Sequence, residues 1–132
     1  MKYLLDTHVW IWAMDDPESL PAGVRAKLFE SANLPFGVSA ISVWEASRKE
    51  SLGKLRLSCP IRQWFAAAIR EPFVELQPLS VDVAHESNHL PGEFHRDPAD
   101  QIIVATARLQ RLTLITADQR ILAYSHVRTL WQ

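Results

Sequence analysis

Short apolar runs alternate with helix-like stretches along the whole chain, and this alternation restricts the fold more than any other feature. Runs typical of buried strands span residues 3–5, 36–39, 73–76, 112–116 and 127–131. Helical spacing or helix-start residues mark 9–14, 19–32, 41–51, the segment after Pro60, 80–89, 97–110 and 118–124. This order favours right-handed crossovers and a sheet covered on both faces. We therefore predict a three-layer α/β/α fold with a central, mostly parallel sheet of four to five strands.

Composition sets the other bounds on the chain. Its 132 residues, 48% hydrophobic and 22% charged, suffice for one buried core, so we expect a single domain over residues 1–132. A net charge of -1 gives no overall basic field, so a nucleic-acid partner would need a local basic patch. The lone Cys59 excludes an internal disulfide and favours the reducing cytoplasm. Charged residues interrupt the apolar N-terminus, which argues against a signal peptide, and no apolar run could span a membrane.

Carboxylates stand where the predicted strands end and the following helices begin. Asp6 follows the run at 3–5, Asp118 follows the run at 112–116, and Glu45 lies in the helix after the run at 36–39. Asp97 and Asp100 open the helix at 97–110. Because the carboxyl ends of parallel strands meet at the edge where such sheets bind ligands, we expect these acids to converge. Taken singly, Asp6, Asp97 and Asp118 also suit the ordinary role of helix N-cap.

Asp100 and Glu45 give the strongest arguments for and against a functional site. Asp100 shares a helix face with apolar residues at 103, 104 and 107, so its carboxylate should point inward and need a cation, hydrogen bonds or a proton. Glu45 has a structural explanation, because Ser42 to Glu45 fits a capping box and Lys49 is spaced for an ion pair with Glu45. Converging acids would need a hard cation, and oxygen ligands suit Mg²⁺ or Mn²⁺ rather than zinc.

Four stretches of the sequence resemble, in order, the successive motifs of PIN domains. They are LLDTHVW (4–10), SAISVWE (39–45), HRDPAD (95–100) and LITAD (114–118). The resemblance covers essentially the whole chain and is closest to the VapC-type toxins of bacterial toxin–antitoxin pairs. It departs at Ala99, Gln101 and Arg111, where similar proteins often carry an aromatic residue, Arg and Gly, but it keeps every acid.

The resemblance implies a metal-dependent endoribonuclease that is the toxin of a toxin–antitoxin pair. The family's catalytic acids, which would also hold Mg²⁺ or Mn²⁺, fall on Asp6, Glu45, Asp100 and Asp118. Three residues would support them from farther away, namely Asp97, Thr7 and Thr116. The implied reaction is hydrolysis of RNA phosphodiester bonds by a metal-activated water. The implied partners are the RNA substrate, a cognate antitoxin and a second copy of the chain.

An acidic centre repels RNA, so a basic rim must offset it. The best candidates lie just beyond Glu45 and are Arg48, Lys49, Lys54 and Arg56. For any one of them alone, a solvated helix face is the simpler interpretation. His95 could also touch substrate, although a loop histidine bonded to the backbone is the simpler interpretation for this residue.

Three other classes of protein can be weighed from the residues alone. A non-catalytic, metal-stabilised binding module would use the same acids without cutting RNA. A receiver-like phosphoacceptor domain also gathers acids at a sheet edge, but it needs a paired-acid motif after the first strand, and Asp6-Thr7-His8 offers none. A dehalogenase-like phosphatase would need a second Asp at the position of His8. RNA cleavage in the presence of a divalent ion separates the binding module from the nuclease.

Overall fold

All the strands of this protein pair in parallel, as the separation of strands by helices predicts. The computed structural model describes residues 1–132. Its strands are β1 (Tyr3–Leu5), β2 (Phe36–Ser39), β3 (Val74–Gln77), β4 (Thr113–Ile115) and β5 (Thr129–Leu130). They form one sheet in the order β3-β2-β1-β4-β5, and every neighbouring pair is parallel. The predicted sheet is confirmed.

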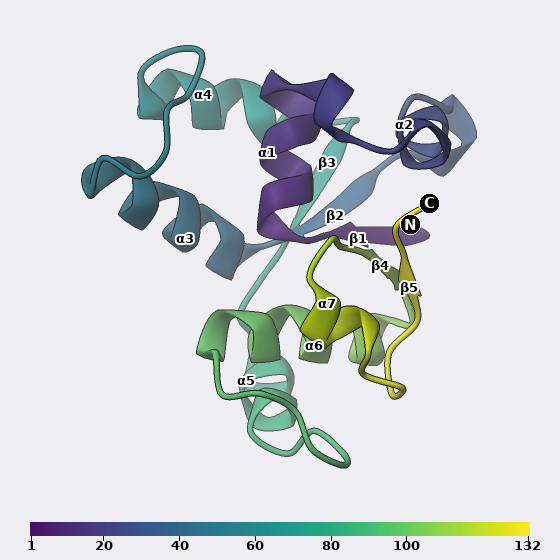
Figure 1. The fold of residues 1–132 in the computed structure, drawn as a ribbon. Coiled ribbons are helices and arrows are strands. Elements are labelled where there is room, and N and C mark those ends of the chain that lie inside the picture. Colours follow the sequence, from purple (N-terminus) through teal and green to yellow (C-terminus); the bar gives the residue numbers. More distant parts are fainter.

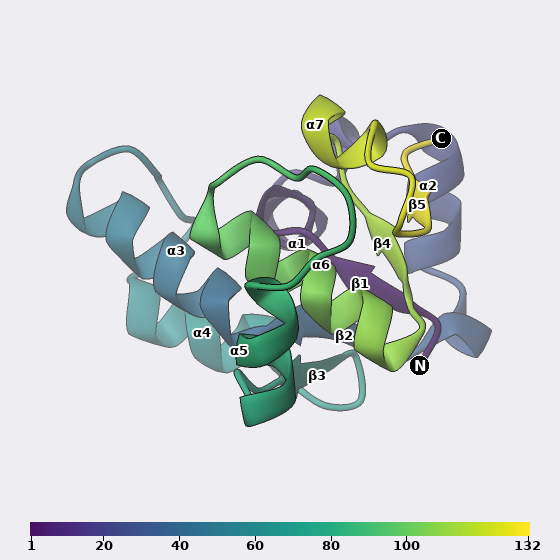
Figure 2. The same cartoon turned by 90° about the horizontal axis from the view of Figure 1, so that it is seen from below.

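Helices cover both faces of the sheet and give the three layers (Figure 1). They are α1 (Thr7–Asp15), α2 (Ala22–Leu28), α3 (Ala40–Ser51), α4 (Ile61–Ala68), α5 (Val81–Ser87), α6 (Pro98–Gln110) and α7 (Gln119–Leu122), with 3₁₀ turns at Pro17–Ser19 and Ser31–Asn33. Figure 1 shows α1, α2 and α4 above the sheet and α5 and α6 below it. Viewed from below, α6 lies across the sheet with α5 beside it (Figure 2).

The alternation of side chains along the strands divides the core into two clusters. Leu4 and Leu114 pair across β1 and β4 and belong to the core between the sheet and α6. Leu5 and Ile115 are the next pair along, and they point to the opposite face, into the core around Trp10 of α1. Successive residues of a strand face opposite sides, so two adjacent apolar residues supply both cores. This explains why β1 is apolar without interruption.

The order of the strands places a crevice at the end of β1. From β1 the chain builds outward through β2 to β3, and it later returns to the other side of β1 with β4 and β5. The order therefore reverses between β1 and β4, and parallel sheets bind ligands outside the carboxyl ends of strands at such a point. The backbone N–H of Asp6, just past β1, donates to the carbonyl of Ile115 at 3.0 Å. Asp6 thus lies at the mouth of the crevice.

Some helix boundaries differ from those predicted. The helix predicted over 19–32 is shorter, because α2 ends at Leu28 and the chain turns through Ser31–Asn33 before β2. Gly53 (φ 70°) follows α3 in the left-handed conformation that glycine adopts without strain, as expected of a helix end. Arg111 (φ 56°) takes this conformation after α6, where similar proteins often have glycine. No helix has the length and apolar character needed to cross a membrane.

Candidate active site

Asp6 lies just past β1 and is held by neutral donors, one of which follows β4. Its side chain is the N-cap of α1, and the residue is only 6% exposed. Asp6 Oδ1 accepts from the Thr7 backbone N–H at 2.8 Å, and Asp6 Oδ2 accepts from the Thr116 hydroxyl at 2.6 Å. The Thr116 oxygen also accepts from the backbone N–H of Asp118 at 3.0 Å. Thr116 therefore joins the end of β1 to the turn that carries the next acid.

Asp118 is the N-cap of α7 and lies against an arginine. Its Oδ1 accepts from the backbone N–H groups of Arg120 at 2.8 Å and Ile121 at 3.4 Å. Its Oδ2 lies 3.2 Å from Nη2 of Arg120. Burial acts to raise the pKa of Asp118, but the hydrogen bonds and positive charge of Arg120 outweigh it and hold this pKa below its usual value. Asp118 therefore stays ionised.

Asp100 points inward from the first turn of α6, as its helical spacing predicts. Asp97 caps this helix, with Oδ1 accepting from the N–H groups of Ala99 at 2.9 Å and Asp100 at 3.2 Å. Asp100 is only 8% exposed, and its Oδ2 lies 2.6 Å from Nε2 of His95 and 3.5 Å from Nη2 of Arg120. Burial raises the pKa of Asp100, and so do the neighbouring acids Asp97, Asp6 and Asp118.

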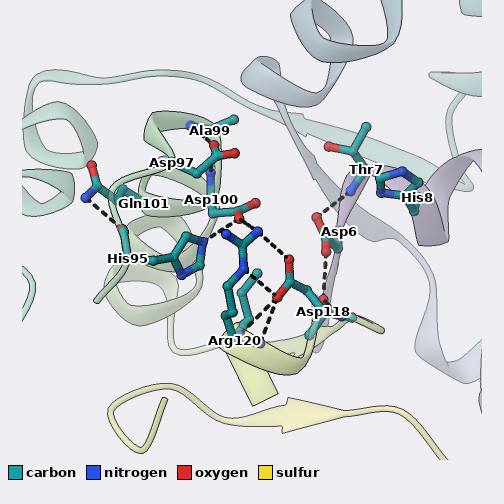
Figure 3. A network of polar contacts seen from close by, with 12 residues as sticks. Asp6, Thr7, His8, His95, Asp97, Ala99, Asp100, Gln101, Asp118 and Arg120 are labelled. Atoms are coloured by element: carbon teal, nitrogen blue, oxygen red, sulfur yellow. Dashed lines mark hydrogen bonds and ion pairs between the residues drawn. The ribbon is translucent and has the colours of Figure 1, made fainter. Parts of the chain in front are cut away.

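The contact made by the His95 ring differs from the simpler interpretation, a bond to the backbone. Its ring contacts the carboxylate of Asp100 rather than a backbone carbonyl. The backbone of His95 is held separately, because the Gln101 amide donates to its carbonyl oxygen at 3.1 Å. Figure 3 shows the His95 ring and the Arg120 guanidinium on the same carboxylate, that of Asp100.

The structural explanation offered for Glu45 is wrong. The N-cap of α3 is Ser39, whose hydroxyl accepts from the Ile41 N–H at 3.2 Å, so Ser42 lies inside the helix and forms no capping box. Glu45 Oε1 instead accepts from the Thr7 hydroxyl at 2.6 Å. Its predicted ion-pair partner, Lys49, contacts the His8 ring at 3.2 Å.

Glu45 is thus linked to the start of α1 rather than to its own helix. Burial raises its pKa, and the charges of Asp100 and Asp6 raise it further, against the lowering effects of the Thr7 hydroxyl and Lys49. Glu45 therefore lies close enough to Asp100 and Asp6 to feel their charges, although burial is the larger cause of its raised pKa.

The four predicted acids line one pocket of about 560 Å³, which we call the acid pocket. Its other lining residues include Asp97, His8, Lys49 and Arg120. Thr7 and Thr116 reach it only through their hydrogen bonds to the acids. No three carboxylate, imidazole or thiol groups are close enough to hold one metal ion. The donor set nevertheless fits a hard divalent ion in its chemistry, because carboxylate oxygens predominate among the polar groups that line the pocket.

The predicted basic rim is partly assembled beside these acids. Arg48, Lys49 and Lys54 line an adjoining pocket of about 490 Å³ that shares Glu45, Lys49 and Asp97 with the acid pocket. The Arg48 guanidinium lies over the ring of Trp44, 5.5 Å from its centroid, and Trp44 is 55% exposed. Arg56 is exposed but lines neither pocket. Three of the four candidates are therefore placed together.

The sequence did not predict the contacts of Arg120 with Asp118 or of His95 with Asp100. Arg120 lies two residues after Asp118 in the first turn of α7, so a signal existed: a long cationic side chain close to its own N-cap. The contact between His95 and Asp100 had a weaker signal, since the loop before α6 brings the ring back over the first turn of the helix. Neither pairing follows from helical periodicity, which describes only residues within an element.

The fold is a parallel α/β/α sheet, and four separate segments bring acids to its switch point. Together these two features define one class of proteins, and comparison with known proteins gives the same family. This chain belongs to the PIN domain family, whose model matches residues 3–127. The resemblance seen in the sequence is confirmed.

Individual relatives point to the same family. Ribonuclease VapC22 of Mycobacterium tuberculosis is 30% identical over 130 residues, which cover 97% of each chain. A structure of VapBC2 from Rickettsia felis, bound to a DNA fragment from its promoter, is similar with a TM-score of 0.72 and 15% identity over the whole of both chains. A toxin–antitoxin complex from Klebsiella pneumoniae has a TM-score of 0.65 and 23% identity, covering 96% of this chain and 95% of that one. The structural likenesses show the fold.

Proposed function

We propose that this chain is a Mg²⁺- or Mn²⁺-dependent endoribonuclease and the toxin of a toxin–antitoxin pair. The observation that carries the proposal is the acid pocket: Asp6, Glu45, Asp100 and Asp118, distant in sequence, line one cavity at the switch point of a PIN domain. The relative that is 30% identical over nearly its full length is a ribonuclease by name. The reaction we propose is hydrolysis of RNA phosphodiester bonds.

The four acids would hold the divalent ion. When bound, such an ion supplies Lewis-acid chemistry, which activates water as a nucleophile and stabilises negative charge on the phosphate. Asp6 is oriented for this task, because both of its oxygens already accept hydrogen bonds from fixed donors. Thr7 orients Glu45 in the same way. These supporting contacts limit how far the carboxylates can turn.

The basic rim would bind the RNA backbone. Arg48, Lys49 and Lys54 lie within a pocket continuous with the acid pocket, so a strand whose phosphates they contact would pass over the acids. Phosphate contacts of this kind position the strand without reading its sequence. Specificity for one RNA would have to come from other contacts.

An antitoxin is the protein partner that we propose. Structures similar to this chain are of toxin–antitoxin complexes from Rickettsia felis and Klebsiella pneumoniae, which supports a small partner protein for this chain as well. We further propose that the chain forms a homodimer. Size-exclusion chromatography with light scattering tests the dimer, and co-expression with the neighbouring reading frame tests the antitoxin.

Cleavage of RNA by the purified protein tests the function. With Mg²⁺ or Mn²⁺ the protein should cut a mixed RNA substrate, and EDTA should stop it. Asp6→Asn keeps the shape of the side chain but removes its charge, so cleavage should fall by at least about 10²-fold, the scale of losing one preorganised electrostatic contact. Asp82→Asn, at an exposed position of α5, is the matched control and should cut like the parent.

Two outcomes would contradict the proposal. If Asp6→Asn cuts RNA as fast as the parent, the acids are not catalytic. If the parent binds RNA and Mn²⁺ but never cuts, the protein is a metal-stabilised binding module, the second reading of the same acids.

A further inference from the structure

Arg120 bridges two acids of the acid pocket. Its Nη2 lies 3.2 Å from Asp118 Oδ2 and 3.5 Å from Asp100 Oδ2, so one guanidinium faces two carboxylates that come from different helices (Figure 3). Its Nε lies 3.4 Å from the other oxygen of Asp118. No other arginine or lysine of the chain forms an ion pair with an acid of this pocket. Arg120 is therefore the positive charge most directly opposed to these acids.

On Asp118, the oxygen that Arg120 approaches most closely is the one left for a metal ion. Asp118 Oδ1 already caps α7 through two backbone N–H groups, so Oδ2 is the oxygen free to bind anything else. Arg120 faces this oxygen. On Asp100 it shares Oδ2 with the His95 ring. A divalent ion that takes these oxygens and the guanidinium cannot lie against them together, because their positive charges repel and both need the same lone pairs.

The guanidinium is also free to move away. The Arg120 side chain is 60% exposed, and exposed ion pairs are weak because water and salt screen them. Arg120 also lines a second pocket of about 300 Å³, together with His95, Tyr124 and His126. Its side chain thus stands on the boundary between the two pockets. Rotation about its own torsions would take the charge from one to the other without moving α7.

We propose that Arg120 is an internal cation of the acid pocket. In the absence of a divalent ion it holds Asp100 and Asp118 together, and it yields their oxygens when the ion binds. It then contacts a phosphate of the substrate at the boundary of the adjoining pocket. This inference rests on the proposed function for the identity of the ion and the substrate. Arginine suits both positions, because its planar fork binds carboxylate and phosphate with similar geometry. The role is one of binding and positioning.

Calorimetric titration with Mn²⁺ alone tests the first half. Wild type, Arg120→Gln and a control, Arg96→Gln, are compared as full chains at one pH and salt concentration. Arg96 is exposed and takes part in none of the ion pairs, so the control makes the same change in net charge. Arg120→Gln should bind Mn²⁺ roughly three- to tenfold more tightly than Arg96→Gln, the range that two exposed ion pairs account for. Equal or weaker binding would overturn the proposal.

A second variant and a melting curve guard against a change in folding. Arg120→Lys keeps the charge but offers no planar fork for two carboxylates, so its affinity for Mn²⁺ should lie between those of wild type and Arg120→Gln. In thermal unfolding, the rise in melting temperature caused by a fixed Mn²⁺ concentration should be larger for Arg120→Gln than for Arg96→Gln, because tighter binding stabilises the folded state more. The same rise in both variants would contradict competition between Arg120 and Mn²⁺ for the acids.

Cleavage kinetics test the second half. At saturating Mn²⁺, Arg120→Gln should raise KM for RNA while changing kcat less, since a phosphate contact is lost but the acids remain. An unchanged KM would refute the substrate contact. The two proposals fail separately: a wild type that binds Mn²⁺ but cuts no RNA refutes the proposed function and leaves the calorimetric comparison valid. A wild type that binds no Mn²⁺ overturns both.

Discussion

The two halves of the acid pocket are held together by different forces. On the side of β1, Asp6 and Glu45 accept hydrogen bonds from a backbone N–H and from the hydroxyls of Thr7 and Thr116. On the side of α6 and α7, Asp100 and Asp118 face the charged or chargeable side chains of His95 and Arg120. The first half relies on buried, neutral donors just past the ends of β1 and β4. The second relies on side chains that reach in from a loop and an exposed helix.

This difference separates what is fixed from what can change. Hydrogen bonds from buried neutral groups hardly respond to salt, because ions do not reach them. Contacts with exposed cations weaken as salt increases, and they can be exchanged for another cation. We infer that the half with Asp6 and Glu45 gives the pocket its shape, whereas the half with Asp100 and Asp118 responds to metal ions.

The largest effect should come from the exposed cations. Replacing the four rim candidates by Gln should lower RNA affinity roughly 10²- to 10³-fold at about 0.1 M salt, because each lost phosphate contact reduces the slope of log K against log salt by about 0.7 for a single strand. The substituted positions are Arg48, Lys49, Lys54 and Arg56. Fluorescence anisotropy with a labelled RNA in EDTA measures binding without cleavage, and the slope should fall by up to about 2.8.

A matched quadruple variant makes this test specific. It removes the same charge at Lys27, Arg70, Arg111 and Arg128, none of which lines the acid pocket. Its slope should stay closer to that of wild type. If both quadruple variants lose the same slope, RNA binding follows net charge, and the rim is not a site. A single variant, Arg56→Gln, sharpens the result: Arg56 lines neither pocket, so it should contribute least of the four.

A smaller effect, on stability, should come from the neutral half. Thr116→Val keeps the shape and strand preference of the side chain but leaves Asp6 Oδ2 without its donor in a buried position. The free energy of unfolding should fall by about 1–3 kcal/mol, measured by urea denaturation. Thr113→Val is the control, because Thr113 begins β4, three residues before Thr116, and is only partly buried. The loss should persist at high salt. A loss that salt removes would contradict the distinction between the halves.

The fold could be predicted because its signals are local. Strands β1, β2 and β4 are short, mostly apolar runs, and each helix starts at a capping residue or proline, so order and type follow from neighbours in sequence. The convergence of the acids at one edge also follows, because parallel strands place their carboxyl ends together. The end of α2 was misjudged for the same reason: its apolar stripe continues past Leu28, and only the structure shows the turn at Ser31–Asn33.

The contacts within the site could be predicted less well because they join distant segments. Helical spacing paired Glu45 with Ser42 and Lys49, whereas the contact it makes is with Thr7, 38 residues away. The bonds of His95 to Asp100 and of Arg120 to Asp100 depend on how a loop and α7 meet α6, which no pattern of single residues encodes. The identity of the acids was accessible from the sequence, but the partners of three of the four were not.

The smallest effect concerns the charge of Glu45 in the absence of metal. Burial and the nearby acids raise the pKa of Glu45, so the folded protein binds its proton more readily than the unfolded chain does. The resulting stability is present below the ordinary pKa of a glutamate, about 4.3, and is lost as pH rises through the raised value. Glu45→Gln carries no charge, so it removes the cost of ionising a carboxyl at this position, while its amide oxygen can still accept from Thr7. In EDTA at pH 7 the variant should melt about 1–3 °C higher than wild type, and the difference should vanish near pH 4. A variant that melts lower at both pH values would mean that the Thr7 contact depends on the charge of Glu45, and the two halves of the pocket would then be alike.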